Sequence, residues 1–289
     1  MPYQIAGHAF ETGPADPGLH VVATPIGNLE DITIRALKTL AGAELVLCED
    51  SRVTRRLFER YGIRTPLKPY HDHNGERVRP EIISRLKAGQ AIGLVSDAGT
   101  PLVSDPGFKL VREAVEEGLD VYGLPGPSAP ILGLTLSGLP SDRFCFSGFL
   151  PQKQGARRAM LEELKTLNAT LIFFESAKRV TSALASIVEV LGNRDVVVAR
   201  EVSKLHEELI RGPAADLQSM DRTLKGEVTL LVGPPAEDVL AAAFDADEYL
   251  RDALERLPAG KAAAEVSKKT GISRKELYER ALQLKRPDG

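Results

Sequence analysis

The chain is poor in cysteine and has no long apolar run. Its two cysteines, Cys48 and Cys145, are too few for a disulfide framework or a zinc ribbon, and they suit a reducing cytoplasm. No apolar stretch approaches the roughly 18 residues of a membrane span, and residues 1–18 lack the basic and apolar regions of a signal peptide. The sequence therefore predicts a cytoplasmic protein that is neither secreted nor inserted in a membrane.

Several common site motifs are also missing. The GxGxxG fingerprint of dinucleotide sites, the GxxxxGK[ST] phosphate loop and the GxSxG elbow of serine hydrolases do not occur. Their absence counts against a dinucleotide oxidoreductase, a P-loop NTPase and a serine hydrolase of that type. A small cofactor that is recognised mainly through backbone and shape remains as the expected ligand.

The composition is that of an ordinary globular protein, long enough for two domains. The 289 residues are 43% hydrophobic and 27% charged, with a net charge of −3. Residues 249–289 contain ten lysines and arginines against six acids, a net charge of +4, whereas residues 1–248 carry −7. A basic tail on an acidic body indicates a partner with phosphates, because lysine and arginine bind polyanions by releasing condensed counterions.

The hydrophobic pattern predicts three folded regions. Short β-branched runs alternate with helical stretches over residues 19–140, which predicts a mostly parallel sheet with helices on both faces. A second α/β domain is expected over residues 141–235, and a helical, basic domain over residues 236–289. That last domain resembles a helix-turn-helix with Gly271 at the turn and Ser273 as N-cap. Residues 1–18 show no apolar periodicity and are predicted to be a flexible leader.

Three strand ends of the first domain are rich in glycine and proline. They span residues 23–28, 96–107 and 124–129, and each follows an apolar strand directly. In a doubly wound sheet, ligands bind beyond the carboxyl ends of the strands, where glycine lets a ligand approach the backbone. One such exit alone is usually a turn, but three that converge predict a binding site at this edge of the sheet.

In their order and spacing these loops resemble the tetrapyrrole methylase superfamily, the class III S-adenosylmethionine-dependent methyltransferases. Within it, the chain is most similar to the ribosomal RNA small subunit methyltransferase I family, which methylates a cytidine ribose 2'-OH of 16S rRNA. The similarity covers about Leu19 to Gly233. It rests on VATPIGNLEDIT (22–33), LCEDSRVTRRL (47–57), HDHN (71–74), LVSDAGTPLVSDPG (94–107), LPGPSA (124–129), GLPSDRF (138–144), GFLP (148–151), FFES (173–176), ARE (199–201) and GEV (226–228).

The resemblance implies two α/β domains with an S-adenosylmethionine cleft between them, a homodimer, and the 16S rRNA of the small ribosomal subunit as partner. Many tetrapyrrole enzymes carry Gly-Asp-Pro where this chain has Gly99-Thr100-Pro101, which favours the ribosomal subfamily over a porphyrin substrate. Asp97 is a candidate either for the amino or ribose groups of the cofactor or for a helix N-cap. The positions that match family cofactor contacts are Pro25, Ala98, Gly99, Thr100, Val103, Ser128, Ala129 and Phe174.

Polar residues after two further strands are candidates for a catalytic rim that contacts the ribose and accepts its proton. The alternatives are a surface ion pair for the first group and an ordinary polar loop for the second. His71 and His73 could face one side of a strand, but no cysteine or third histidine is near, so no metal site is predicted. The rim candidates are Glu49, Asp50, Arg52, His71 and Asn74.

Clustered cations are candidates for contacts with RNA phosphates. Those at the starts of two second-domain helices oppose the helix dipole, so helix stability does not explain them; ordinary solvated charge is the alternative. The helix-turn-helix has the same ambiguity, since such a fold reads DNA or attaches an enzyme to structured RNA. The RNA-binding candidates are Lys153, Arg157, Arg158, Lys178, Arg179, Lys268, Lys269, Arg274 and Lys275.

Two other functions use the same motifs. A DNA-binding regulator would have the helix-turn-helix as its reader and the α/β body as a ligand sensor. A methylase of a porphyrin-like small molecule would share the cofactor loops but would not need a basic C-terminal region. The second-domain basic clusters favour a large RNA partner over both.

Overall fold

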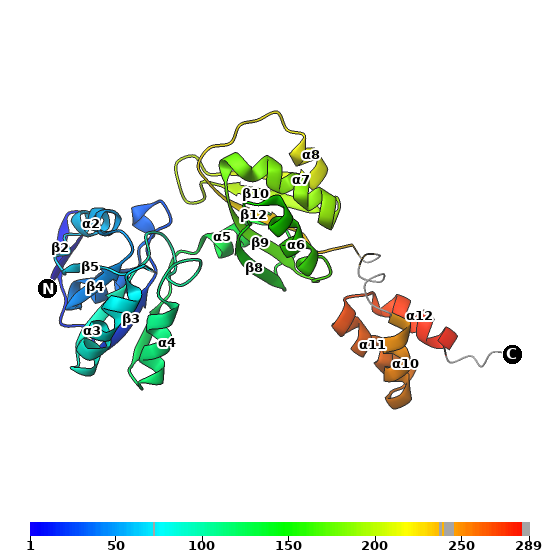
Figure 1. Ribbon diagram of the computed structural model, residues 1–289, viewed down its shortest axis with the longest axis horizontal. Helices are drawn as coiled ribbons and strands as arrows, with labels where there is room; N and C mark the ends of the chain where they lie inside the picture. Colours follow the sequence, from blue (N-terminus) through cyan, green and yellow to red (C-terminus); the bar gives the residue numbers. More distant parts are fainter. Residues whose placement is uncertain (72, 237–238, 240–245, 285–289) are drawn as a thin grey trace. The chain divides into compact units, whose positions relative to one another are not determined.

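The structure is a computed structural model that describes residues 1–71, 73–236, 239 and 246–284 (Figure 1). The chain forms two compact units, one of residues 1–132 with 201–207 and one of residues 133–200 with 208–289. The expected boundary near residue 140 therefore lies too late. Glycine and proline at residues 138–140 follow helix α5 (Ala129–Ser137), whose Gly133 lies against Thr229 and Leu231 of the second unit.

The first unit is built on a five-stranded parallel sheet, as the sequence predicts. The strands are β3 (Gly18–Val22), β4 (Leu45–Cys48), β5 (Leu67–Pro69), β6 (Ala91–Leu94) and β7 (Val121–Leu124), in the order β5-β4-β6-β3-β7. Both faces are covered by helices. Val46 packs in the cluster of α1 (Ile34–Gly42) and α2 (Ser51–Arg60), whereas Leu45 and Leu47 pack with α3 (Gly75–Lys87) and α4 (Phe108–Glu116). Such two-sided burial explains the continuous apolar runs of β4 and β6, which are buried throughout.

The prediction of a flexible leader is wrong. β1 (Pro2–Ile5) and β2 (His8–Glu11) form an antiparallel hairpin. Its two turn residues, Ala6 and Gly7, both have positive φ, the backbone that a tight two-residue hairpin turn requires. Tyr3 is 2% exposed in the α1–α2 cluster, and the amide of Gln4 donates to the carbonyl of Tyr61 at 2.7 Å. A single buried tyrosine anchors the hairpin. One apolar residue does not produce a periodic pattern, so the sequence analysis did not detect these strands.

The second unit contains the other α/β sheet. Its strands are β8 (Phe144–Phe149), β9 (Thr170–Ser176), β10 (Asp195–Arg200), β11 (Glu208–Pro213) and β12 (Glu227–Val232), in the order β11-β10-β12-β9-β8. Only the β8–β9 pair is parallel. Its helices are α6 (Gln154–Leu164), the short 3-10 turn η2 (Ala177–Arg179), α7 (Val180–Leu191) and α8 (Ala214–Gln218). Leu161, Leu184 and Ile187 of α6 and α7 belong to the buried core of this sheet.

Three helices form the C-terminal region, which agrees with the expected helical domain. They are α10 (Ala246–Arg256), α11 (Ala259–Thr270) and α12 (Arg274–Leu284), joined through a core that includes Leu250, Ile272 and Leu277. Gly271 ends α11 with φ 77°, and α12 begins directly after Ser273. Residues 237, 238, 240–245 and 285–289 of the expected domain lie outside the described residues. None of the helices described is long and apolar enough to cross a bilayer.

Candidate functional site

The sheet order of the first unit brings the candidate loops together. Because every neighbouring pair of strands is parallel, all five carboxyl ends meet at one edge of the sheet. The exits of β6, β3 and β7 carry the three Gly/Pro-rich loops and are consecutive in the sheet. The exits of β5 and β4, which carry the rim candidates, continue the same edge.

The three loops are bonded to one another. The amide of Thr24 donates to the carbonyl of Gly99 at 2.8 Å, and the amide of Gly99 donates back to Thr24 at 3.0 Å. The hydroxyl of Thr100 donates to the carbonyl of Pro127 at 3.1 Å. Gly126 lies so close to Ala23 that a Cβ at residue 126 would be 2.8 Å from the Ala23 Cβ. The predicted convergence is therefore a direct contact of all three loops.

The proposed cofactor residues of this unit lie on these bonded loops. Pro25 and Gly99 are buried, while Thr100, Val103, Ser128 and Ala129 are half-buried and Ala98 is exposed. Gly99 has φ 84°, and a Cβ there would lie 3.2 Å from the Ile26 side chain. Small side chains and exposed backbone at residues 98, 125 and 126 leave room for a ligand over these loops.

Asp97 connects two strand exits and does not cap a helix. Its Oδ1 accepts from the amide of Asp50 at 3.0 Å, which ties the β6 exit to the β4 exit. The next helix, α4, has Gly107 at its N-cap position and no side-chain cap. The N-cap alternative for Asp97 is thereby excluded.

Asp50 and Arg52 form a local ion pair at the start of α2. Asp50 is the N-cap and accepts from the Arg52 amide at 2.8 Å, while the Arg52 guanidinium donates to both carboxylate oxygens at 2.6–3.1 Å. Hydrogen bonds from the Arg52 side chain and amide lower the pKa of Asp50 to about 2. Asp50 is thus ionised at neutral pH and has little tendency to take up a proton.

Asp105 is a carboxylate of this edge that the sequence analysis missed. Burial raises its pKa to about 6; a hydrogen bond with Ser96 opposes the shift, and the charges of Glu49 and Asp97 add to it. Its loop is strained, because Leu102 and Ser104 have φ values of 72° and 65°. The only signal in the sequence was that Asp105 is the third-to-last residue of the long second loop. An aspartate at such a place is equally typical of an ordinary turn.

The residues after β5 show a structural use for Asn74. Its Oδ1 accepts from the His71 amide at 2.9 Å and its Nδ2 donates to the carbonyl of Pro69 at 3.0 Å, so the amide holds this turn. The Nδ1 atom of His71 is buried and has no hydrogen-bond partner among the described residues. The His71 and His73 rings lie 6.0 Å apart. No group of three metal-ligating side chains occurs in the described part of the chain.

Segment 201–207 also belongs to the first unit, which the sequence did not reveal. The Ser203 hydroxyl bonds the Asp31 carboxylate. The Lys204 stem covers Gly27, which has φ 151° and where a Cβ would lie 2.3 Å from the Lys204 Cγ. The backbone conformation of the first loop therefore favours glycine at residue 27, whereas the flexible Lys204 side chain could move to admit a Cβ.

Phe174, the cofactor candidate of the second unit, lies in an aromatic cluster. Its ring centroid is 4.9 Å from that of Phe146 and 5.3 Å from that of Phe149. Phe149 is 58% exposed, so the cluster offers apolar surface beside the carboxyl end of β9. The contributions of Phe146 and Phe149 required the parallel pairing of β8 with β9 and were not predicted.

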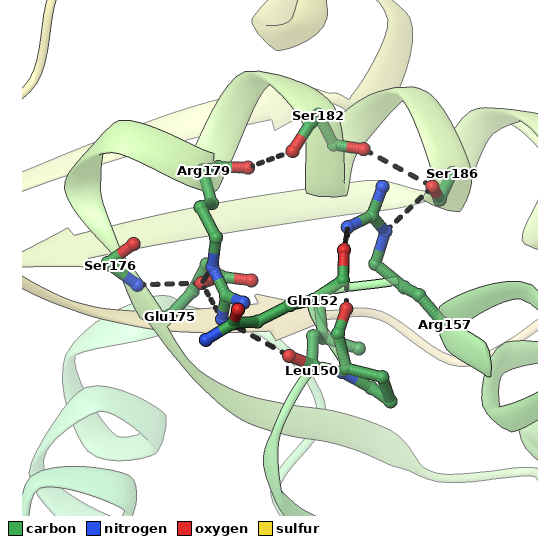
Figure 2. Close-up of polar contacts among 9 residues, drawn as sticks. Leu150, Gln152, Arg157, Glu175, Ser176, Arg179, Ser182 and Ser186 are labelled. Carbon is green, nitrogen blue, oxygen red and sulfur yellow. Dashed lines mark hydrogen bonds and ion pairs between the residues drawn. The ribbon is translucent and has the colours of Figure 1, made fainter. Parts of the chain in front are cut away.

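Arg157 and Arg179 correct the expectation of a surface cation cluster. Arg157 is 5% exposed; its Nε donates to Ser186 Oγ at 2.9 Å, and its Nη1 donates to the carbonyls of residues 151 and 152 (Figure 2). Arg179 pairs with the fully buried Glu175 side chain and donates to the Leu150 carbonyl at 3.1 Å. Both guanidiniums have partners inside their own unit, which explains cations at helix starts without an RNA contact, although Nη1 of Arg179 is buried with no partner among the described residues.

The other candidate cations lie on the surface. Arg158 pairs with Glu189 at 2.8 Å. Lys269 lies 4.8 Å from the centroid of the Tyr249 ring, and Arg274 donates to the carbonyl of residue 260 at 3.4 Å. The side chains that remain exposed are Lys153, Arg158, Lys178, Lys268, Lys269, Arg274 and Lys275.

Two family profiles match the chain. That of the tetrapyrrole (corrin/porphyrin) methylases matches residues 18–218, and that of the RsmI C-terminal HTH domain matches residues 240–285. Solved structures of a uroporphyrin-III-C-methyltransferase from Thermus thermophilus and of a diphthine synthase superpose with TM-scores of 0.55 and 0.58 at 19% and 16% identity. They cover 75% and 77% of this chain and 94% and 90% of their own, and at such identity they support the fold alone.

Curated relatives are much closer in sequence. The ribosomal RNA small subunit methyltransferase I of Mesorhizobium japonicum is 50% identical over 280 residues, which are 96% of this chain and 95% of that protein. The protein of the same name from Escherichia coli O157:H7 is 44% identical over 271 residues, covering 92% and 94%. This chain therefore belongs to the tetrapyrrole methylase family and, within it, to the ribosomal RNA small subunit methyltransferase I family.

Proposed function

We propose that the protein transfers the methyl group of S-adenosylmethionine to the ribose 2'-OH of a cytidine in the 16S rRNA of the small ribosomal subunit. The observation that carries the proposal is the direct bonding of three Gly/Pro-rich strand exits, in a chain whose relatives over nearly its full length are named for this rRNA. The expected homodimer and cytoplasmic location are part of the same proposal.

The first-unit loops fit S-adenosylmethionine, which supplies an electrophilic methyl group on a sulfonium when bound. Thr24 and Gly99 lock the first two loops together, and Thr100 fixes the third. Exposed backbone at residues 98 and 126 and the carboxylate of Asp97 would hold its polar groups. Phe174 stays in the proposed set as an apolar contact.

The rim residues would orient the ribose and take its proton. Methyl transfer needs the ribose oxygen about 3–3.5 Å from the methyl carbon and an acceptor for a weakly acidic proton. Because the pKa of Asp50 is about 2, we assign the Asp50–Arg52 pair to ribose and phosphate contacts. Asp105, whose pKa is about 6, is the better acceptor at neutral pH. Glu49 and His71 complete this edge, and Asn74 shapes its turn.

The exposed cations of the second unit and of the C-terminal helices would bind phosphates. Lys153 and Lys178 are exposed at the starts of α6 and η2. Lys268 and Lys275 flank the turn between α11 and α12. Such contacts position RNA without reading its sequence. Arg157 and Arg179 are left out of this set because their guanidiniums are engaged inside the unit.

Incubation with tritium-labelled S-adenosylmethionine and small ribosomal subunits that lack this modification tests the proposal. Label that nuclease digestion maps to one cytidine ribose supports it, with fully modified subunits as the matched control that takes up none. Cofactor binding without RNA label would favour a small-molecule methylase. Sequence-specific binding of duplex DNA without methyl transfer would favour a regulator.

A further inference from the structure

A groove on the first unit lies beside the proposed cofactor and rim residues and contains none of them. It has a volume of about 280 Å³ and is lined by residues of α2, of strand β5 and of the loop that joins them; both elements are labelled in Figure 1. Phe58, Ile63 and Leu67 form its apolar part, and the first two are at most 5% exposed. Two exposed arginines, Arg55 and Arg64, also line the groove.

The groove lies in a positively charged part of the surface. Helix α2 carries four arginines, of which Arg52 pairs with Asp50 and Arg60 lies 3.8 Å from Glu30. Arg55 and Arg64 make no ion pair with any described residue. Glu59 is the one acid in the lining, so the two unpaired arginines leave the groove with net positive charge.

The volume and the arginines of the groove suit one segment of a polyanion. Its volume is below the roughly 300–1,000 Å³ of sites that enclose a whole small-molecule ligand, so it suits part of a larger molecule. Arginine binds phosphate with a planar fork of donors, and apolar lining in the same groove accepts a sugar or base face. An acidic protein segment would meet the same charges but would gain less from a floor of this small size.

The position of the groove points to the same partner. It begins at Ser51, the residue directly after Asp50, whose pair with Arg52 stands at the proposed catalytic rim. An RNA strand that presents a ribose at the rim must continue on both sides of that nucleotide. The groove includes Ser51 and Pro69 at the edge of the rim and continues to Arg64, before the amino end of β5, so an RNA strand that leaves the rim along α2 would cross it.

We propose that this groove binds a phosphodiester and ribose of the RNA strand next to the methylated nucleotide, with Arg55 and Arg64 as the phosphate ligands. The proposal rests on the proposed function, since it takes rRNA as the substrate. It assigns RNA recognition to the first unit, in addition to the exposed cations of the second unit and the C-terminal helices.

The test compares the double variant Arg55→Gln/Arg64→Gln with the wild type and with Arg35→Gln. Arg35 is an exposed arginine of α1 that does not line the groove. Binding of each protein to unmodified small subunits and to naked 16S rRNA is measured by filter retention between 50 and 200 mM salt, and methyl transfer is measured in parallel. Each lost phosphate contact with a single strand lowers the slope of log K against log salt by about 0.7.

We expect the double variant to bind both RNA forms about tenfold more weakly, with a slope of log K against log salt reduced by about 0.7–1.4. Its affinity for S-adenosylmethionine should equal that of the wild type. Arg35→Gln should bind RNA with the wild-type affinity and slope. A double variant with the wild-type slope overturns the groove assignment and leaves the proposed function intact. Weaker binding to subunits alone, with naked 16S rRNA unaffected, overturns it in favour of a ribosomal protein partner.

The proposed function is refuted independently of the groove assignment if the wild type binds RNA but transfers no methyl group to it. In that case the salt slopes still decide the groove assignment. A wild type that neither binds RNA nor methylates it overturns both.

Discussion

The buried ion pair between Glu175 and Arg179 gives a prediction of large effect. The Glu175 side chain is completely buried, and its Oε1 accepts from the Ser176 amide at 2.7 Å and from Arg179 Nε at 2.6 Å. Its Oε2 has no partner among the described residues. Arg179→Met would leave this carboxylate with one backbone hydrogen bond, and an unpaired buried charge costs about 3–5 kcal/mol.

Differential scanning calorimetry measures the loss as a shift of the second-unit transition. For a unit of about 150 residues, 1 kcal/mol lowers Tm by about 2–4 °C, so Arg179→Met should lower it by at least about 6 °C. The double variant Glu175→Gln/Arg179→Met removes both charges and should recover most of this loss.

Arg158→Met is the matched control, because the Arg158–Glu189 pair is about half exposed and is expected to contribute only about 0–1 kcal/mol. If Arg179→Met shifts the transition no more than Arg158→Met does, the buried-pair reasoning is refuted. Arg179 would then return to the set of proposed RNA contacts.

Three further predictions concern the first unit. Ionised Asp105 destabilises the fold, because the folded pKa of about 6 lies above the ordinary 3.8: the unfolded chain releases the proton first as pH rises. Asp105→Asn should therefore raise the free energy of unfolding by about 1–2 kcal/mol at pH 8, a value below the full linkage energy because the carboxyl is partly exposed. Below pH 4 the substitution should have no effect. Urea titrations that give the same gain in unfolding free energy at every pH would contradict this. Tyr3→Ala should cost about 3–5 kcal/mol and expose the N-terminal hairpin to limited proteolysis, whereas a leader that is flexible already would show no change. Gly126→Val should weaken S-adenosylmethionine binding at least tenfold in calorimetric titration, because its Cβ would press on Ala23 and separate the first and third loops; wild-type affinity would show that this contact does not shape the site.

Much of the site edge followed from the sequence. The strand before the second Gly/Pro-rich loop, β6, is a short apolar run that is fully buried, as expected for a parallel sheet covered on both faces. Parallel strands then place all carboxyl exits together, so Thr24, Gly99 and Pro127 could be expected at one edge before any contact was known. The Gly271 turn of the C-terminal helices is equally local, because a left-handed backbone favours glycine.

Side-chain roles did not follow, because residue type and position leave the partner undefined. Arg157 and Arg158 are neighbours in sequence, yet one is buried against Ser186 and the other pairs at the surface with Glu189. The direction of each follows from the rotation of α6 about its axis, which packing on the sheet decides. Asn74 likewise looked available for a ligand, but its amide is used by the backbone of its own turn.

The sequence by itself determined the parallel sheet of the first unit, the helical C-terminal region and the loops at which a ligand could bind, because these depend on local periodicity and on glycine and proline. Only the tertiary structure decided which groups meet. The hairpin depends on Tyr3 reaching a distant core, the ionisation of Asp105 depends on burial beside Glu49 and Asp97, and the groove depends on α2 lying against β5. The first two are contacts between segments far apart in the chain, about which short-range pattern carries no information. The groove depends on how two consecutive elements pack, which residue type alone does not define.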